Sequence, residues 1–287
     1  MQGSFLSGIH LPGIQSVVRR LSSTGGLLAR GLLLFAFFCA LSQTMCAATD
    51  VLSRPQAGLR NSNGSRRLSA SQLRKLAESL RQKTGFWELR FDGAGFLTLG
   101  DRTRIAGGSA AARELLIATV DGRMAIELEA HDNSPHVAFA RITAGAVYTH
   151  FETQAPIEAR QVQIDFSDFA ELRGEREAMA AFDLGFAVLH ELVHGVRGLR
   201  DAVGETAELG ECDELINRMR RELNLPERLG YSARTRAVLS GPAGEMRRAE
   251  LVFARERMKS GRVRTKRFHL YWDAKRVADV PNSKHGV

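Results

Sequence analysis

Cysteine is scarce in this sequence, which limits what can hold the fold together. Three cysteines occur in 287 residues: Cys39 and Cys46 lie in or beside an N-terminal apolar segment, and Cys212 lies far from both. If that segment is removed on export, no disulfide can form within the mature chain. Stability must then come from a hydrophobic core, for which a hydrophobic content of 44% is sufficient, or from a bound metal ion.

Acidic residues are absent from positions 1–48, which hold three arginines and an apolar run over 31–41. This is the layout of an export signal. The run has about half of the roughly 20 residues that cross a bilayer, so a cleaved signal, cut after Ala48, is favoured over a permanent anchor. Cys46 leaves a lipid anchor as an alternative. We therefore expect a periplasmic or extracellular protein, bound to a membrane only through an uncleaved signal or a lipid anchor.

A strong excess of one charge is also lacking. Without the three N-terminal arginines, the 40 basic residues fall to 37 against 32 acidic ones, which leaves a net charge of +5. The densest basic cluster, residues 255–267, alternates with other residue types as in an exposed hairpin. We interpret this cluster as a solvated basic face and expect no nucleic acid among the partners.

Large apolar side chains are nearly absent from residues 49–68, which are rich in Ser, Asn, Gly and Arg and predict a flexible linker. Three leucines at helical spacing then predict a short amphipathic helix over 69–82, with Ser69 or Ser71 as its cap. The chain divides into three parts: an export signal over 1–48, a linker with a short helix over 49–82, and a folded domain over 83–287.

The first half of this domain shows apolar residues at period two, which is typical of strands. A hairpin is expected over 87–99 and a helix over 109–120. Four further strands are expected, over 124–130, 136–142, 147–152 and 161–166. The middle of the chain is therefore predicted to form a mostly antiparallel sheet with a helix packed against it, which places the domain in the α+β class.

Two helices are predicted in the second half. Apolar residues at spacings of three and four place a long helix over 175–195, with one face in the core. A second helix, rich in acidic residues, is expected over 206–224. A hairpin that turns at 259–261 is expected near the C-terminus.

The long helix contains His190 and His194, four residues apart, and Glu191 directly after the first histidine. This spacing brings both imidazoles to one face of a helix, within reach of one ion. Neutral imidazole is a good ligand for Zn²⁺, which lowers the pKa of a bound water to about 7. Glu191 lies one position further round, where it can accept a proton from that water without binding the ion. The alternative interpretation is a pair of satisfied core histidines.

A catalytic zinc site needs a third protein ligand, and the second helix offers carboxylates. Because a ligand must face the partner helix, Glu211 is favoured, followed by Glu214 and then Glu208. The remaining candidates are Asp201, Glu205 and Asp213. Cys212 is expected to be a small buried residue or to face the metal.

The long helix, with a sheet before it and an acidic helix after it, resembles the zincin fold of zinc metallopeptidases, and the gluzincins in particular. In that fold the HExxH helix lies beneath a sheet whose edge strand holds the peptide. The resemblance implies that His190 and His194 bind zinc and that Glu191 is the catalytic base. Residues 217–231 are similar to the segment after the active site in a family of secreted bacterial effector metallopeptidases.

These features predict an exported zinc-dependent peptidase that acts on a peptide or protein, in which zinc-bound water attacks the peptide bond with Glu191 as general base. Tyr231 is a weaker catalytic candidate, which could polarise the scissile carbonyl. The alternative is a noncatalytic exported binding protein with a structural or degenerate zinc site. The number of protein ligands separates the two, because a structural site is closed by four ligands whereas a catalytic site keeps one position open.

Overall fold

The structure, a computed structural model, describes most of the chain after its N-terminal segment. The described residues are 57–149, 156–202, 209–230, 234–241 and 244–274. All of them belong to one unit that begins at Pro55. The export signal predicted over 1–48 lies outside the described residues, so export stays a prediction.

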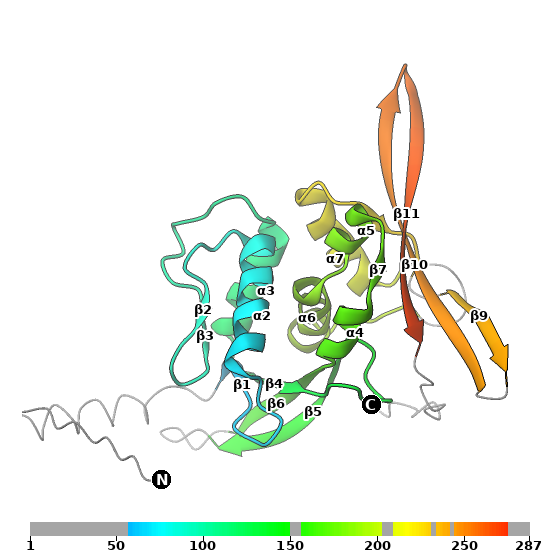
Figure 1. Ribbon diagram of the computed structural model, residues 1–287. Coiled ribbons are helices and arrows are strands. Elements are labelled where there is room, and N and C mark those ends of the chain that lie inside the picture. The colour runs from blue at the N-terminus through cyan, green and yellow to red at the C-terminus, as the bar shows by residue number, and fades with distance from the viewer. Residues whose placement is uncertain (1–56, 150–155, 203–208, 231–233, 242–243, 275–287) are drawn as a thin grey trace, which may run out of the picture. The chain divides into compact units, whose positions relative to one another are not determined.

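A sheet of four strands forms the base of the first half of this unit (Figure 1). Its strands are, in spatial order, β1 (Gly58–Asn61), β4 (Ala125–Ala130), β6 (Pro156–Ile164) and β5 (Ala140–Thr149). β1 and β6 run parallel to β4, and only β5 pairs antiparallel, with β6. The prediction of a mostly antiparallel sheet is wrong here, because helices connect β1 to β4 and β6 inserts between β4 and β5.

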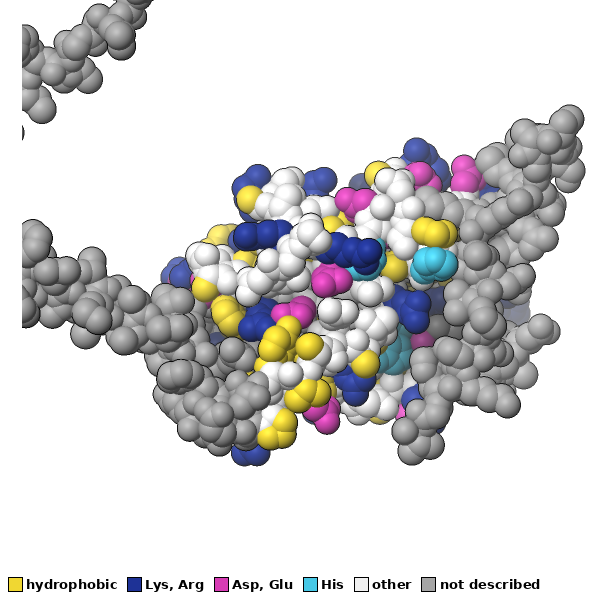
Figure 2. All heavy atoms as spheres, turned by 90° about the horizontal axis from the view of Figure 1, so that it is seen from below, with side chains coloured by type: hydrophobic (Ala, Val, Ile, Leu, Met, Phe, Trp, Pro, Cys, Tyr) yellow, Lys and Arg dark blue, Asp and Glu magenta, His cyan; other side chains and the backbone are white. Residues whose placement is uncertain are grey.

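β5 joins two segments that the sequence analysis separated. The strands predicted to begin at 136 and 147 form one strand, with an irregularity in pairing between Ala144 and Val147. β5 is the last strand of the described sheet, so its outer edge is not paired with another described strand of this sheet. Seen from below (Figure 2), hydrophobic, basic and acidic side chains are interspersed on the described part of the face.

The prediction of a linker over 49–68 is wrong for its second half. Leu59 in β1 and Leu68 after it are each 1% exposed and belong to the main hydrophobic core. Arg60, between them, forms a buried ion pair with Glu127 of β4 at 2.8 Å. Both leucines in the described part of this segment are therefore buried, and the folded domain begins before residue 83.

Three helices lie over one face of the first sheet (Figure 1). They are α2 (Ala70–Thr84), α3 (Ala110–Val120) and α6 (Leu184–Leu192). Ser69 caps α2 in a capping box with Gln72, and Ser109 caps α3. These two helices and the short hairpin between them, β2 (Arg90–Phe91) and β3 (Leu97–Thr98), confirm the predictions.

The long helix predicted over 175–195 is divided into three. α5 (Arg176–Ala181) ends before Asp183, whose side chain accepts a hydrogen bond from the Phe186 N–H at 3.0 Å and begins α6. α6 then continues as a π-helix, η2 (Val193–Arg197). The helix breaks at Asp183 because an aspartate side chain accepts hydrogen bonds from the free backbone N–H groups at the start of a helix. Within a helix those N–H groups are already bonded to the backbone. Residues 176–197 are long and apolar enough to cross a membrane. Core helices have the same property, and half of the most apolar window in this range is buried within the fold.

A second sheet, of five strands, is formed mainly by the last part of the described chain. Its strands are β7 (Arg173–Gly174), β11 (Arg262–Ala274), β10 (Gly244–Lys259), β8 (Glu227–Arg228) and β9 (Arg234–Gly241), all paired antiparallel. α4 (Phe166–Glu171) and α5 pack against it. β10 and β11 form the predicted hairpin and turn at Ser260 and Gly261, both with positive φ, as such two-residue turns require.

α7 (Glu211–Glu222) packs against α3 and α6 and leads into β8. It confirms the described part of the helix predicted over 206–224. Its apolar stripe of Cys212, Ile216 and Met219 is buried in the main core. The first turn of α7 therefore lies beside the C-terminal end of α6.

Candidate metal centre

Four side chains converge where α6 ends. They are His190 and His194 from α6 and η2, Asp201 from the following segment, and Cys212 from α7, and one potential ligand atom of each lies within 4.8 Å of the others. The two Nε2 atoms lie 3.1 Å apart. Asp201 Oδ1 lies 3.2 Å from His190 Nε2, and its Oδ2 lies 3.3 Å from His194 Nε2. Ligand atoms bound tetrahedrally at about 2.0–2.1 Å from zinc lie about 3.3 Å apart, so these contacts fit one shared ion.

The carboxylate beside the two histidines belongs to Asp201 and not to Glu211, which the sequence analysis favoured. Glu211 and Glu214 are both exposed, and neither belongs to the converging group. The difference follows from where α7 begins: its phase turns Cys212 and Ile216 toward the core, so Glu211 and Glu214 of its first turn face solvent. The carboxylate that lies beside the two histidines is therefore on the connection between the helices.

The other predicted residues divide into two groups. Asp213 is fully buried, but its Oδ1 pairs with Arg228 Nη1 at 3.3 Å. Glu205, Glu208 and Tyr231 lie outside the described residues.

Backbone contacts with α7 hold Asp201 in place. The Cys212 N–H donates to the Arg200 carbonyl at 3.2 Å. Gly198, with φ of 65°, ends the π-helix and redirects the chain toward α7. A Cβ atom on Gly210 would lie 2.4 Å from Ala202 N, so only glycine allows this approach.

Hydrogen bonds on the far side of each imidazole orient the rings. His194 Nδ1 lies 2.6 Å from the Leu199 carbonyl oxygen, so Nδ1 donates and Nε2 keeps its lone pair toward the centre. His190 Nδ1 lies 3.4 Å from Cys212 Sγ. The Nε2 atoms of both rings and the Asp201 carboxylate therefore lie close together, and a proton or a cation between them would relieve the repulsion of these groups.

The charges around the two histidines favour a cation. Burial lowers the pKa of each imidazole, but hydrogen bonds with Asp201 and Cys212 outweigh this effect. The pKa of His190 is raised to about 10 and that of His194 to about 11. A divalent cation supplies the positive charge that these surroundings stabilise.

Cys212 lies on the outer side of His190. Its Sγ faces Nδ1 of that ring, whereas Asp201 and His194 meet at Nε2. If both histidines bind through Nε2, Cys212 acts as a hydrogen-bonding partner of His190, and the ion has three protein ligands. Three ligands leave a coordination position for water or substrate.

Glu191 is buried beside this group and is held by β5. Its Oε2 accepts a hydrogen bond from the Ile142 N–H at 2.8 Å. Burial raises the pKa of Glu191, although the two histidines oppose the shift. Gly195 packs against the same strand, since a Cβ atom there would lie 2.7 Å from Ile142 Cδ1. The helical backbone continues past Gly195 to Arg197.

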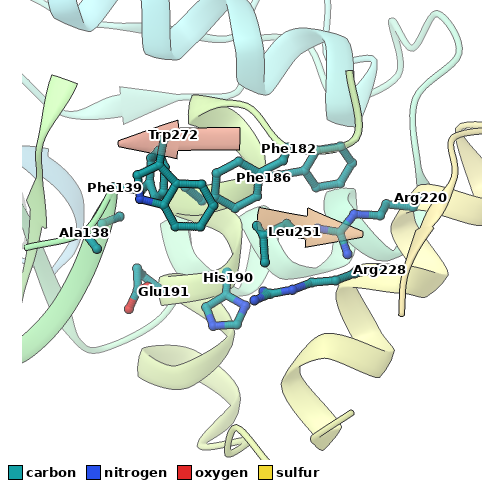
Figure 3. Close-up of a pocket in the computed structure, with 12 residues that line it drawn as sticks. Ala138, Phe139, Phe182, Phe186, His190, Glu191, Arg220, Arg228, Leu251 and Trp272 are labelled. Carbon is teal, nitrogen blue, oxygen red and sulfur yellow. The ribbon is translucent and has the colours of Figure 1, made fainter. Parts of the chain in front are cut away.

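A cavity of about 460 Å³ opens beside His190 and Glu191 (Figure 3). Its other lining residues come from both sheets, two helices and the segments that connect them: Ala138, Phe139, Ala140, Phe182, Phe186, Ala187, Arg220, Arg228, Leu251 and Trp272. Figure 3 shows aromatic side chains along one side, and Arg220 and Arg228 at the end away from Glu191. The sequence analysis did not find this cavity, because its residues share no spacing along the chain.

No protein family, curated protein or solved structure matches the chain.

Proposed function

We propose that the protein is a zinc-dependent peptidase of the zincin type, with His190, His194 and Asp201 as ligands and Glu191 as general base. The convergence of the two imidazole Nε2 atoms and the Asp201 carboxylate, at distances that suit one shared ion, supports this function most directly. A zinc ion held there would lower the pKa of a water molecule and polarise a carbonyl group.

The surroundings of Glu191 suit a general base that later acts as a general acid. Its raised pKa suits a carboxylate that takes up a proton as the water attacks and passes it to the leaving nitrogen. The hydrogen bond from the Ile142 N–H fixes the direction of the carboxylate. This bond also brings the outer edge of β5 next to the reacting atoms, where an extended peptide can add as a further strand. The cavity then receives a substrate side chain.

Elemental analysis of the purified full chain tests the metal ligands. We expect about one zinc per chain, lost in His190→Ala and Asp201→Ala and kept in the control Glu211→Ala, whose side chain is exposed. Glu191→Gln should keep the zinc but hydrolyse an unfolded protein substrate about 10²–10⁴-fold more slowly. A chain that takes up no zinc, or a Glu191→Gln variant with unchanged hydrolysis, would refute the proposal.

A noncatalytic protein with a structural zinc is the second candidate, because Cys212 belongs to the converging group. Cobalt substitution separates the two. A cobalt-bound thiolate gives strong charge-transfer absorption in the near ultraviolet, which we expect to be absent from the wild-type protein. If it is present and Cys212→Ala abolishes it, the site is closed by four ligands and the peptidase proposal fails.

A further inference from the structure

The turn end of the β10–β11 hairpin, residues 255–267, carries basic and apolar side chains on opposite faces. We propose that this end of the hairpin binds the surface of an anionic lipid bilayer. Met258 and Val263 enter the headgroup region, and the basic side chains contact the lipid phosphates. As far as the structure describes them, the metal centre and the cavity include none of these residues, so lipid binding is separate from the proposed peptidase function. It is also separate from the N-terminal membrane attachment that the sequence leaves open.

The hairpin projects from the folded body. Phe253 and its partner Phe268 are buried in the core of the second sheet. Beyond them, every residue from 256 to 267 whose exposure is described is exposed, and this part lies past the helices of the body in Figure 1. Met258 is five residues from Phe253, which corresponds to about 16 Å along a strand. The turn can therefore reach a flat surface while the body stays clear of it.

One face of the projecting part is basic. Side chains directly opposite one another on an antiparallel pair share a face, and so do alternate residues of one strand. Five basic residues share a face by this register: Arg255, Arg257, Arg262, Arg264 and Lys266. Glu256, the one acidic residue of 255–267, lies on the other face. Arg257 faces Arg264 directly, and like charges in such a pair lower the stability of the fold unless an anion lies against them.

The other face ends in an apolar pair near the turn. Met258 lies opposite Val263, and the two residues are 71% and 58% exposed. The turn itself, Ser260 and Gly261, has no charge. Transfer of large apolar side chains from water to the boundary between headgroups and acyl chains is favourable. A face that only needed to stay solvated would gain nothing from this pair.

The spacing of the two features fits a bilayer surface. An apolar group at that boundary lies about 5–10 Å below the bilayer surface. Lys266 is three residues further from the turn than Val263, or about 10 Å along the strand, which places it among the headgroups. Arg257 and Arg264 lie between, where long side chains extend toward the phosphates while their methylene groups stay in apolar surroundings. Anionic lipids supply the attraction that these charges need.

Nucleic acid is the other polyanion that a basic hairpin can meet, and the composition of the hairpin does not favour it. Residues 255–267 contain no aromatic side chain on which a base could stack. Contacts with phosphates along the basic face would also leave Met258 and Val263 in water. A bilayer uses both faces of the hairpin.

Sedimentation of the full chain with lipid vesicles tests the proposal. One set of vesicles is phosphatidylcholine alone, and the other is an equal mixture of phosphatidylcholine and phosphatidylglycerol. We expect the mixed vesicles to bind at least about tenfold more tightly, and this binding to weaken in high salt. Equal binding to the two sets of vesicles would overturn the proposal.

A double variant separates the hairpin from the N-terminal arginines, which stay in place throughout. Arg257→Gln with Arg264→Gln should weaken binding to the mixed vesicles about tenfold or more. Arg67→Gln with Arg90→Gln is the matched control, because both positions are exposed, lie outside the hairpin and remove the same charge. Circular dichroism checks that both double variants are folded. An equal loss of binding in the two would show an effect of net charge alone and would contradict the assignment.

The apolar pair is tested by its insertion. Met258→Ser with Val263→Ser should weaken binding to the mixed vesicles and keep its salt dependence, whereas Ile105→Ser, at an exposed apolar position outside the hairpin, should leave binding unchanged. In Met258→Trp, the emission added by the new tryptophan should move to shorter wavelength when mixed vesicles bind. Unshifted emission from bound protein would refute insertion of the turn.

Competition with duplex DNA identifies the other polyanion. If DNA displaces the mixed vesicles, and Arg257→Gln with Arg264→Gln weakens DNA binding more than vesicle binding, the partner is nucleic acid and the lipid proposal fails. These measurements do not involve hydrolysis. Absent zinc or absent hydrolysis would therefore refute the peptidase proposal alone, and absent vesicle binding would refute the lipid proposal alone.

Discussion

Gly210 packs against the backbone of Asp201 so closely that a Cβ atom at position 210 would lie 2.5 Å from the Asp201 carbonyl carbon. A residue without a functional group thus determines where Asp201, a proposed zinc ligand, lies. The contact joins the start of α7 to the segment that follows η2, and the Cys212 N–H bond to Arg200 supports it.

Gly210→Ala should weaken zinc binding without removing a ligand. The added methyl group forces the Asp201 segment away from α7. Loss of the contacts that orient a ligand typically lowers metal affinity by about 10–100-fold. Competition with a chromophoric chelator measures the change. Gly93→Ala is the control, because a Cβ atom there meets nothing within 4 Å. Equal affinities in the two variants would show that Asp201 is placed by other contacts.

Removal of zinc should lower the stability of the folded chain. A ligand that binds only the folded state adds about 2.7 kcal/mol when its free concentration is 100 times its dissociation constant. Thermal unfolding with saturating zinc and with chelator gives the difference. We expect the gain in Tm to vanish in Asp201→Ala and to remain in Glu214→Ala, since the Glu214 side chain is exposed. A gain that persists without Asp201 would place the ion elsewhere.

Leu59→Ala tests whether β1 belongs to the folded domain. Leu59 is 1% exposed in the main core, and truncation of such a leucine costs about 2–5 kcal/mol. Urea unfolding followed by circular dichroism measures the loss. Arg67→Ala, at an exposed position of the same segment, should change the free energy of unfolding by less than about 0.5 kcal/mol. If Leu59→Ala is equally neutral, residues 58–61 are a linker after all.

The β10–β11 hairpin places like charges opposite one another, as Arg257 faces Arg264 across the two strands. Both side chains are exposed. Arg264→Glu should stabilise the fold by about 0.2–1 kcal/mol, because an opposite-charge pair replaces a repulsive one. The gain should shrink in high salt. Arg90→Glu, on an exposed strand position outside this hairpin, controls for the change in net charge. A destabilised Arg264→Glu variant would contradict the expected repulsion.

The sequence by itself determined the features that depend on neighbouring residues. The helix cap and the hairpin turn depend on backbone geometry within a few positions: Ser69 is one of the two predicted caps, and the turn at Ser260 and Gly261 lies within the predicted 259–261. The spacing of His190 and His194 likewise brings their Nε2 atoms together on one helix face. Such patterns are visible in the chain because the groups that interact lie within a turn or two of each other.

Tertiary packing decided the remaining features. The spatial order of the strands depends on how helices cross the sheet, and the choice of Asp201 over Glu211 depends on where α7 begins and how closely Gly210 lets it approach. The cavity likewise exists only where two sheets and two helices meet. These relations join residues far apart in the chain, and the packing that brings them together has no period in the sequence.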